Sequence, residues 1–277
     1  MAIFLIGIDD TDNQNSRGTG WLARRLSEEC ANRRMRPLGV TRHQFLVHPA
    51  IPYTSHNSGA CIALESQDRR ARGPCFSGLR AQASRAIARD LAEFIFDFVA
   101  RNSADGSDPG VCLAKASDIP DYISEFAHLA TRQVVAMDEA YDLAGRAAIA
   151  LRGLGGTCQG VIGALGSVGL RAAGNDGRFI DLPGLRELEG CVDVATFDRI
   201  GVVVEYGRCR LPNAECQFQS KIANRQSKIC SVETLDWVRP RLVGGKAVLP
   251  LEWCEQKNAW IPLDRKQGHS DRGGSRS

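Results

Sequence analysis

Three aspartates, Asp9, Asp10 and Asp12, stand within four residues of one another near the N-terminus. Neighbouring carboxylates repel each other, and oxygen ligands of this kind suit a hard divalent cation. We therefore predict that all three bind Mg²⁺ and act as catalytic groups. The alternative is that they form turns and helix caps, which aspartate does readily.

The flanking residues place this acidic cluster between a strand and a helix. Residues 2–8 form an apolar run typical of a strand buried on both faces, and a helix is expected from Thr19 to about Arg33, with Thr19 as its cap. In open α/β sheets ligands bind at this end of a strand, and a helix N-terminus offers N–H groups to phosphate. A metal–nucleotide complex needs ligands for a cation next to a site for phosphate. We therefore predict that ATP and Mg²⁺ bind here together.

A second glycine-rich loop, from Gly153 to Gly160, precedes a predicted helix of small and apolar residues that runs to Gly169. No Gly-x-x-x-x-Gly-Lys-Ser/Thr loop exists, and Cys158 replaces the last glycine of a dinucleotide motif, so a P-loop NTPase or a Rossmann enzyme is disfavoured. The predicted nucleotide-binding residues are Gly7, Thr11, Arg17, Gly18, Gly155, Gly156 and Gly160.

The other elements follow from hydrophobic periodicity and turn residues. Strands are expected at 39–48, 59–65 and 111–114, and helices at 78–100, 119–132 and 138–151. Two short strands are expected around an Asn175-Asp176-Gly177 hairpin, and a further hairpin at Gly244-Gly245. We predict a catalytic ATP-binding region over 1–190, a small β-rich appendage over 191–264 and a disordered polar tail over 265–277.

Composition excludes several classes. The 277 residues carry a net charge of +3, which gives no strong argument for nucleic acid, and the ten cysteines include no C-x-x-C pair. The N-terminal apolar run is too short for a signal peptide or a membrane span, so we expect a cytoplasmic protein without a membrane partner. Buried or peripheral thiols are favoured over a zinc site at Cys209, Cys216, Cys230 and Cys254.

Other polar residues could take part. His43, His48 and His56 could bind a metal or move protons, although loop histidines more often form ordinary hydrogen bonds. Arg17 and Arg42 could bind phosphate with their planar guanidinium groups, and the alternative for both is a solvated surface.

Several blocks of the sequence resemble one family. They are Gly7-Ile8-Asp9-Asp10-Thr11-Asp12, Ser16-Arg17-Gly18-Thr19, Ile51-Pro52-Tyr53, Gly59-Ala60, Pro109-Gly110, Asp138-Glu139-Ala140 and Gly160-Val161-Ile162-Gly163-Ala164-Leu165. In order and approximate spacing the chain resembles, over residues 3–170, the catalytic part of archaeal tRNA-isoleucine agmatidine synthetase (TiaS).

The resemblance implies an α/β (α+β) fold, with an atypical kinase-like domain and a ferredoxin-like portion. It also implies an enzyme that uses ATP to activate a cytosine carbonyl, which agmatine then attacks. Thr19 aligns best with a threonine that is phosphorylated in that family. Tyr53, His56 and Asn57 lie in or beside a resembling block and are the candidate substrate-binding residues.

The sequence also departs from the family. In the family an OB-fold and a zinc ribbon that grip tRNA follow the catalytic part, whereas this chain offers a short β-rich tail without C-x-x-C pairs, and the loop before Thr19 is shorter. The family's Thr-Thr becomes Thr19-Gly20, and Thr54 and His56 replace a basic pair. ATP chemistry is therefore expected to carry over better than tRNA specificity, and tight tRNA binding by this chain alone is not expected.

Together these observations favour an ATP- and magnesium-dependent phosphoryl-transfer enzyme, a kinase-like ligase or transferase. The phosphoryl acceptor could be the carbonyl group of a nucleobase or a small molecule, which is thereby activated to react with an amine. It could also be Thr19, which would pass the phosphoryl group on. Two alternatives stay open. One is a nucleotide-sensing or RNA-binding module without turnover, and the other is a metal-dependent phosphohydrolase.

Overall fold

The computed structural model describes residues 2–51, 56–68, 77–206, 231–234, 238–254, 256–257 and 259–263. The chain divides into two compact units, one formed by Met1–Pro183 with Leu242–Gly245 and the other by Gly184–Arg241 with Lys246–Ser277. Tyr53 and the expected disordered tail lie outside the described residues.

The first unit is built on an antiparallel sheet. Its strand order is β5 (Ala150–Gly153), β4 (Gly110–Lys115), β1 (Ile3–Asp9), β3 (Ser58–Ser66), β2 (Met35–Gln44) and β6 (Arg178–Asp181). β1 is central, since Gly7 pairs with Cys61 on one side and Cys112 on the other. Its residues from Phe4 to Ile8 are buried, which confirms the predicted strand.

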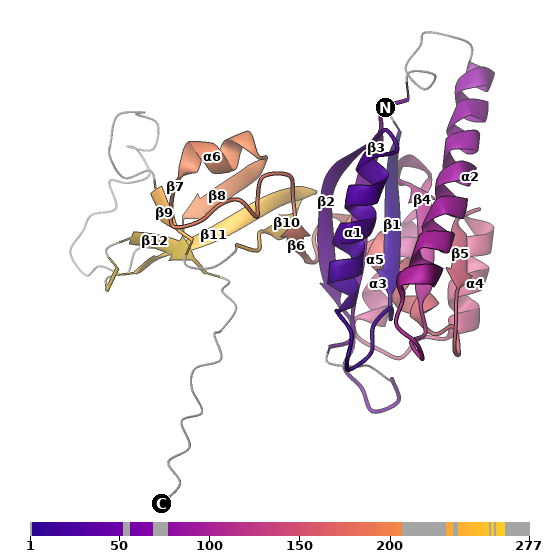
Figure 1. Ribbon diagram of the computed structural model, residues 1–277. Helices are drawn as coiled ribbons and strands as arrows, with labels where there is room; N and C mark the ends of the chain where they lie inside the picture. The colour runs from indigo at the N-terminus through magenta and orange to yellow at the C-terminus, as the bar shows by residue number, and fades with distance from the viewer. Residues whose placement is uncertain are drawn as a thin grey trace, which may run out of the picture. The chain divides into compact units, whose positions relative to one another are not determined.

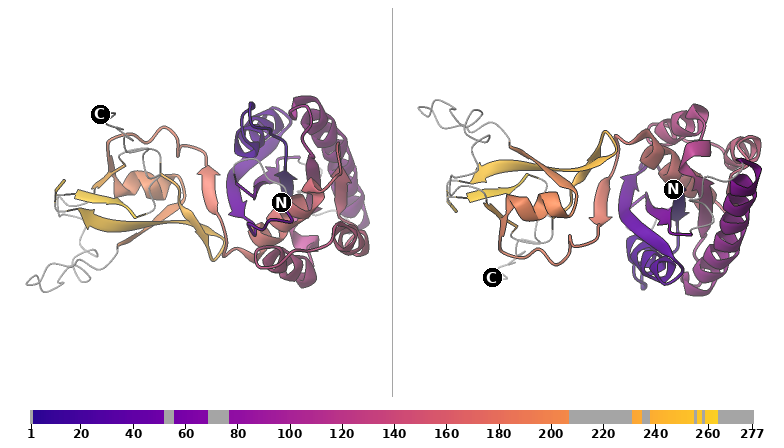
Figure 2. Two further views of the ribbon diagram at one scale, coloured as in Figure 1. Left: turned by 90° about the horizontal axis from the view of Figure 1, so that it is seen from below. Right: turned by 90° about the horizontal axis from the view of Figure 1, so that it is seen from above.

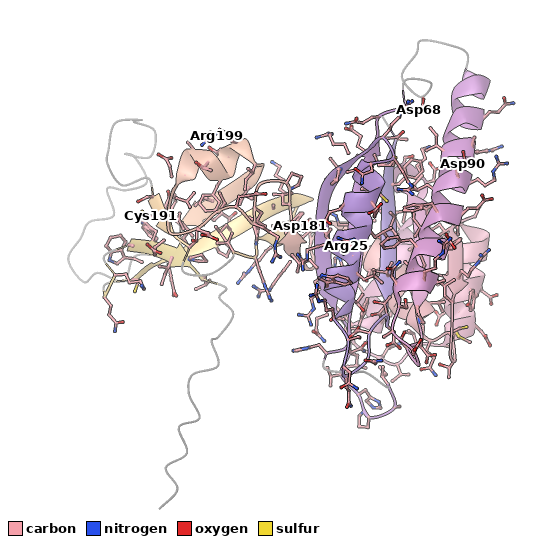
Figure 3. The ribbon with its side chains drawn as sticks, in the orientation of Figure 1. Arg25, Asp68, Asp90, Asp181, Cys191 and Arg199 are labelled. Atoms are coloured by element: carbon pink, nitrogen blue, oxygen red, sulfur yellow. The ribbon has the colours of Figure 1, made fainter. Side chains whose placement is uncertain are left out.

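Helices cover both faces of this sheet (Figures 1 and 2). α1 (Thr19–Ala31) and α2 (Ser77–Asn102) lie on one face, and charged side chains such as Arg25 and Asp90 cover their outer sides (Figure 3). α3 (Asp121–Ala130), α4 (Met137–Arg146) and α5 (Gly160–Ala173) lie on the other face. There Leu5 and Cys112 share one core with Phe126 of α3. The α+β class is confirmed.

The backbone of α5 lies directly against the central strands. A Cβ atom on Gly7 would stand 1.9 Å from the carbonyl oxygen of Ala164, and one on Gly110 would stand 2.0 Å from the carbonyl carbon of Gly160. Only glycine allows two backbones to approach this closely. The small residues therefore bring the start of α5 beside the end of β1.

Three expected boundaries were wrong. Gly18 is the N-cap of α1, so Thr19 is the first helical residue rather than the cap. The expected hairpin at Asn175 is absent because α5 continues to Ala173, where Gly174 ends it with a φ of 76°. The helix expected over 138–151 ends at Arg146, and β5 follows it.

The second unit is β-rich. β11 (Lys246–Cys254) pairs in parallel with β8 (Val202–Tyr206) and antiparallel with β12 (Ala259–Pro262). β9 (Ser231–Glu233) joins β12 and also pairs with β7 (Cys191–Asp193), which leads into α6 (Val194–Arg199). The side chain of Asp193 caps α6 by accepting a bond from the Ala195 amide.

The predicted Gly244-Gly245 turn is confirmed, because both glycines have positive φ, 55° and 75°. The six described cysteines are free, and Cys30, Cys61 and Cys112 are buried. Of the four cysteines weighed as zinc ligands, Cys254 alone lies among the described residues. In the part of the chain that the structure describes, no helix has the length and apolar character needed to cross a membrane.

Candidate functional site

A cavity of about 300 Å³ lies in the first unit, where the end of β1 meets the start of α5. Its polar lining is formed by Asp9, Asp10, Asp12, His56, Asn57, Ser58, Gln133, Thr157 and Gln159, with Gly160 and Gly163 of α5. Its apolar lining is formed by Phe45, Ala50, Ile51, Ala130, Val134, Val135, Met137 and Ile162. The cavity thus has both acidic and apolar walls.

Asp9, the last residue of β1, stands against α5. Its Oδ1 accepts a hydrogen bond of 2.9 Å from the Asp10 amide, and its Oδ2 lies 1.6 Å from where a Cβ atom on Gly163 would stand. Burial raises the pKa of Asp9 to about 7, opposed by the Asp10 amide and reinforced by the charges of Asp10 and Asp12. The folded chain therefore holds the Asp9 proton more tightly than an exposed carboxyl group would.

Asp10 begins the turn that leaves β1. Its φ of 52° lies in the left-handed region, which aspartate tolerates better than most residues. Burial raises its pKa to about 6, and the charges of Asp108 and Asp12 act in the same direction. Asp10 and Asp9 therefore form an acidic pair on which a divalent cation would relieve repulsion.

Asp12 is held by the start of α1. Its Oδ1 accepts a bond of 2.8 Å from the Thr19 hydroxyl and one of 3.2 Å from the Thr19 amide. The Thr19 Oγ1 in turn accepts bonds from the hydroxyl and the amide of Thr11, at 3.1 and 3.3 Å. Thr19 is only 6% exposed and does not line the cavity. A carboxylate bonded to a hydroxyl can act as a base beside a nucleophile, and here it also braces the helix.

Several amides at the two helix N-termini already have partners within the chain. At the start of α1 the Thr19 amide donates to Asp12 and the Trp21 amide to the Gly18 carbonyl, and at the start of α5 the amides of Gly160, Val161 and Ile162 donate to backbone carbonyls. Fewer amides are therefore free for phosphate than the sequence led us to expect, because the turns before each helix satisfy these groups internally. The partial positive charge of the α5 N-terminus remains beside Asp9.

The other predicted residues divide into two groups. His56, Asn57 and Gly160 line the cavity, and the Asn57 side chain also donates to the Leu46 carbonyl at 2.6 Å. The residues that lie away from it are Gly7, Thr11, Arg17, Gly18, Gly155 and Gly156. Arg17 stacks over the Trp21 ring at 4.9 Å instead of reaching the cavity.

The remaining histidines hold structure together. His43 is fully buried, with Nε2 2.8 Å from the Thr41 hydroxyl and Nδ1 3.4 Å from Asp176, and burial lowers its pKa. These contacts give His43 the ordinary hydrogen-bonding role that the sequence analysis favoured over metal binding. His48 accepts a bond of 3.1 Å from the Ala50 amide, which is the ordinary loop role.

Arg42 brings a positive charge close to Asp12 of the acidic loop. Its Nε donates to the Ser58 hydroxyl at 2.9 Å, and Ser58 lines the cavity. Burial lowers the pKa of Arg42, while the charge of Asp12 raises it. Arg42 therefore acts on the acidic end of the cavity through Asp12 and Ser58.

The carboxylate oxygens of Asp9 and Asp10 are suitable ligands for a divalent cation. Among the described residues no three His, Cys, Asp or Glu side chains already converge as a metal site, because Asp12 turns toward Thr19. Asp9 and Asp10 nevertheless supply oxygen donors to one cavity and hold their protons unusually tightly. Magnesium commonly binds through one or two carboxylates and completes its shell with water and phosphate oxygens.

Several site residues escaped the sequence analysis. Gly163 follows Gly160 by one helical turn, and this spacing of small residues was the signal for close packing against Asp9. Phe45 and Gln133 carry no local signal, because only the fold brings them to the cavity. Asp108, which holds the second glycine-rich loop, was also missed.

A scan against models of protein families gives no match, and a search of curated proteins gives none. Solved structures do match. They include a tRNA fluorescent labeling enzyme (24% identity, TM-score 0.47, covering 60% of this chain and 36% of that chain) and a complex of TiaS with a tRNA and ATP (22%, 0.49, 61% and 36%). Apo TiaS, a tRNA agmatidine synthetase, matches at 21% identity and a TM-score of 0.46, over 60% of this chain and 35% of that one.

Two of these structures carry the name of the family that the motifs resemble. The chain spans about a third of the length of the proteins it matches.

Proposed function

We propose that this chain is an ATP- and magnesium-dependent phosphoryl-transfer enzyme. The observation that carries the proposal is the meeting of three aspartates with the N-terminus of α5 in one cavity, which is also lined by neutral polar and apolar residues. A nucleoside triphosphate bound to a metal likewise combines a charged end with a flat, weakly polar end. Catalysis would rest on positioning and on neutralising charge, as in phosphoryl transfer generally.

Magnesium would be required for binding as well as for chemistry. Asp9, Asp10 and Asp12 make the polar end anionic, and the first amides of α5 are already bonded. A triphosphate without a cation would therefore meet repulsion with few donors to offset it. In this proposal Asp9 and Asp10 hold the ion and Asp12 lies beside it.

Thr19 is the candidate phosphoryl acceptor within the chain. Its hydroxyl donates to Asp12 at 2.8 Å, so Asp12 can take the proton as the oxygen attacks the γ-phosphorus. The bond from the γ-phosphorus to the bridging oxygen of ADP breaks as the new P–O bond forms, and ADP leaves. Because Thr19 is buried, transfer requires the first turn of α1 to open toward the cavity.

The external acceptor is proposed to be a nucleobase or small-molecule carbonyl. Its oxygen attacks the γ-phosphorus of ATP and ADP leaves; an amine then attacks the activated carbon and displaces the phosphate. The resembling motifs support this class, and the names of matched structures that contain tRNA and ATP give a substrate to test first. His56 and Asn57, on the cavity wall, would contact it.

A nucleotide screen tests the proposal. Thermal unfolding is followed with ATP, GTP, CTP, UTP and ADP, each with and without Mg²⁺, and stabilisation by ATP with Mg²⁺ is expected. ATP consumption is then measured with candidate acceptors. Stabilisation without consumption favours a nucleotide-sensing module, and hydrolysis of simple phosphate esters without nucleotide preference favours a phosphohydrolase.

A further inference from the structure

Asp108 holds the glycine-rich loop that precedes α5. Its Oδ2 accepts a bond of 2.6 Å from the Thr157 hydroxyl, and its Oδ1 accepts one from the Thr157 amide. Its own carbonyl oxygen accepts a bond of 3.2 Å from the Gly160 amide. One residue in the loop just before β4 thus holds the glycine-rich loop at its middle, through Thr157, and at its end, through Gly160.

The loop is shaped to receive this carboxylate. Gly156 has a φ of 55°, and a Cβ atom there would stand 1.5 Å from the Asp108 Oδ1. Cys158, whose φ of 62° is rare for a residue with a side chain, directs its Sγ to within 2.6 Å of where a Cβ atom on Gly153 would stand. Backbone conformations of this kind persist only where neighbouring contacts enforce them.

Asp108 itself does not line the cavity, whereas Thr157, Gln159 and Gly160 do. Its contacts therefore end on residues that line the same cavity as Asp9 and Asp10. A carboxylate with both oxygens committed to one threonine serves as a fixed support rather than as a ligand.

We propose that Asp108 is a positioning residue, which latches the loop over residues 154–160 through Thr157 so that the cavity is already shaped for the metal–nucleotide complex. This inference rests on the proposed function, because the nucleotide for which the loop would shape the cavity is the ATP of that proposal. The latch itself is independent of any ligand.

Cys158 reports on the latch directly. In the ligand-free protein, iodoacetamide labelling of Cys158 is followed by peptide mass spectrometry, with the exposed Cys191 of the second unit as the internal reference. Asp108→Ala removes both acceptors and Thr157→Val removes the hydroxyl bond, so both should speed Cys158 labelling about fivefold or more. Asp108→Asn can still bond to Thr157 and should restore slow labelling. Asp118→Ala, at an exposed aspartate in the short 3-10 helix Ala116–Asp118, should label like the wild type.

Calorimetry of ATP with Mg²⁺ on the same variants gives the second measurement. Asp108→Ala and Thr157→Val should weaken binding about fivefold or more, and Asp108→Asn should bind nearly as the wild type does. Unchanged Cys158 labelling in Asp108→Ala and Thr157→Val contradicts the latch. Fast labelling with unchanged ATP affinity contradicts the positioning role, as does an Asp108→Asn variant that labels slowly but binds poorly. A wild type that binds no nucleotide contradicts the proposed function, while the labelling rates still decide the latch.

Discussion

The Thr19 hydroxyl donates to the Asp12 carboxylate at 2.8 Å, directly after the acidic loop. If Thr19 is a phosphoryl acceptor, incubation with ATP and Mg²⁺ should add one phosphoryl group to the wild type. Thr19→Ser keeps the hydroxyl and should still be labelled, whereas Thr19→Val should not. Intact-mass and peptide mass spectrometry measure the result. An unmodified wild type that still consumes ATP eliminates the relay and leaves direct transfer to an external acceptor.

Thr19→Val also tests whether the hydrogen bonds of Thr19 to Asp12 and Thr11 stabilise the start of α1. The variant removes a donor to Asp12 and an acceptor for two Thr11 bonds, all at a buried position. We expect it to lower the free energy of unfolding by about 1–3 kcal/mol. Thr131→Val, which removes a single bond to the His128 carbonyl, should cost less in urea denaturation. Equal costs for the two variants would show that the Thr19 bonds add no special stability.

A matched pair of glycine substitutions tests the contact between α5 and Asp9. In Gly163→Ala the new methyl group would stand 1.6 Å from the Asp9 Oδ2, so the carboxylate must move and magnesium-dependent ATP affinity should fall at least tenfold. In Gly145→Ala of α4 nothing lies within 4 Å, and this variant should be stabilised by up to about 1 kcal/mol. Calorimetry and thermal unfolding separate the effects. Wild-type ATP affinity in Gly163→Ala would contradict the geometry.

The raised pKa values of Asp9 and Asp10 predict how stability depends on pH. Each carboxyl group ionises near pH 3.8 in the unfolded chain but near 7 and 6 when folded, so the folded state holds the protons more tightly. The contribution to stability is complete below the unfolded pKa and is lost as pH rises through the folded pKa. Without metal, the free energy of unfolding should therefore fall between about pH 4 and 7 relative to that of Asp9→Asn.

Magnesium should oppose that loss, because the cation replaces the protons on the same carboxylates. Urea denaturation at about pH 5 and pH 8, with and without Mg²⁺, should show stabilisation by the metal mainly at the higher pH. The same stabilisation in Asp9→Asn and in the wild type would place the cation elsewhere.

We do not expect this chain to hold full-length tRNA tightly by itself, given its +3 charge and its lack of paired cysteines. Any binding should weaken steeply as salt increases. Filter binding with several tRNAs over a range of salt concentrations measures this. A sub-micromolar complex with one tRNA at physiological salt, selective over others, would instead favour the complete synthetase activity.

The sequence alone predicts those features of the structure that depend on residues adjacent in the chain. The apolar run before Asp9 predicted β1, and the acidic loop predicted one wall of the cavity. The Gly244-Gly245 turn was also found, because two glycines at a hairpin meet a backbone requirement that neighbouring residues do not alter.

The remainder depends on contacts between distant segments. Asn175-Asp176-Gly177 has the composition of a hairpin, yet α5 continues to Ala173 because its apolar face is buried against the sheet. Asp108 and Thr157 form one loop support although they belong to separate predicted segments. A single sequence indicates neither their pairing nor the occupation of the helix amides by nearby turns.

The most direct test is calorimetric titration of ATP into the wild type and Asp9→Asn, in Mg²⁺ and again in EDTA, with Asp118→Asn as the control. We expect ATP to bind the wild type in Mg²⁺ and to bind little in EDTA. We also expect at least tenfold weaker binding by Asp9→Asn, about 1.4 kcal/mol or more, with Asp118→Asn unchanged. ATP affinity that is the same in EDTA, or the same in Asp9→Asn, would contradict a metal–nucleotide site at the end of β1.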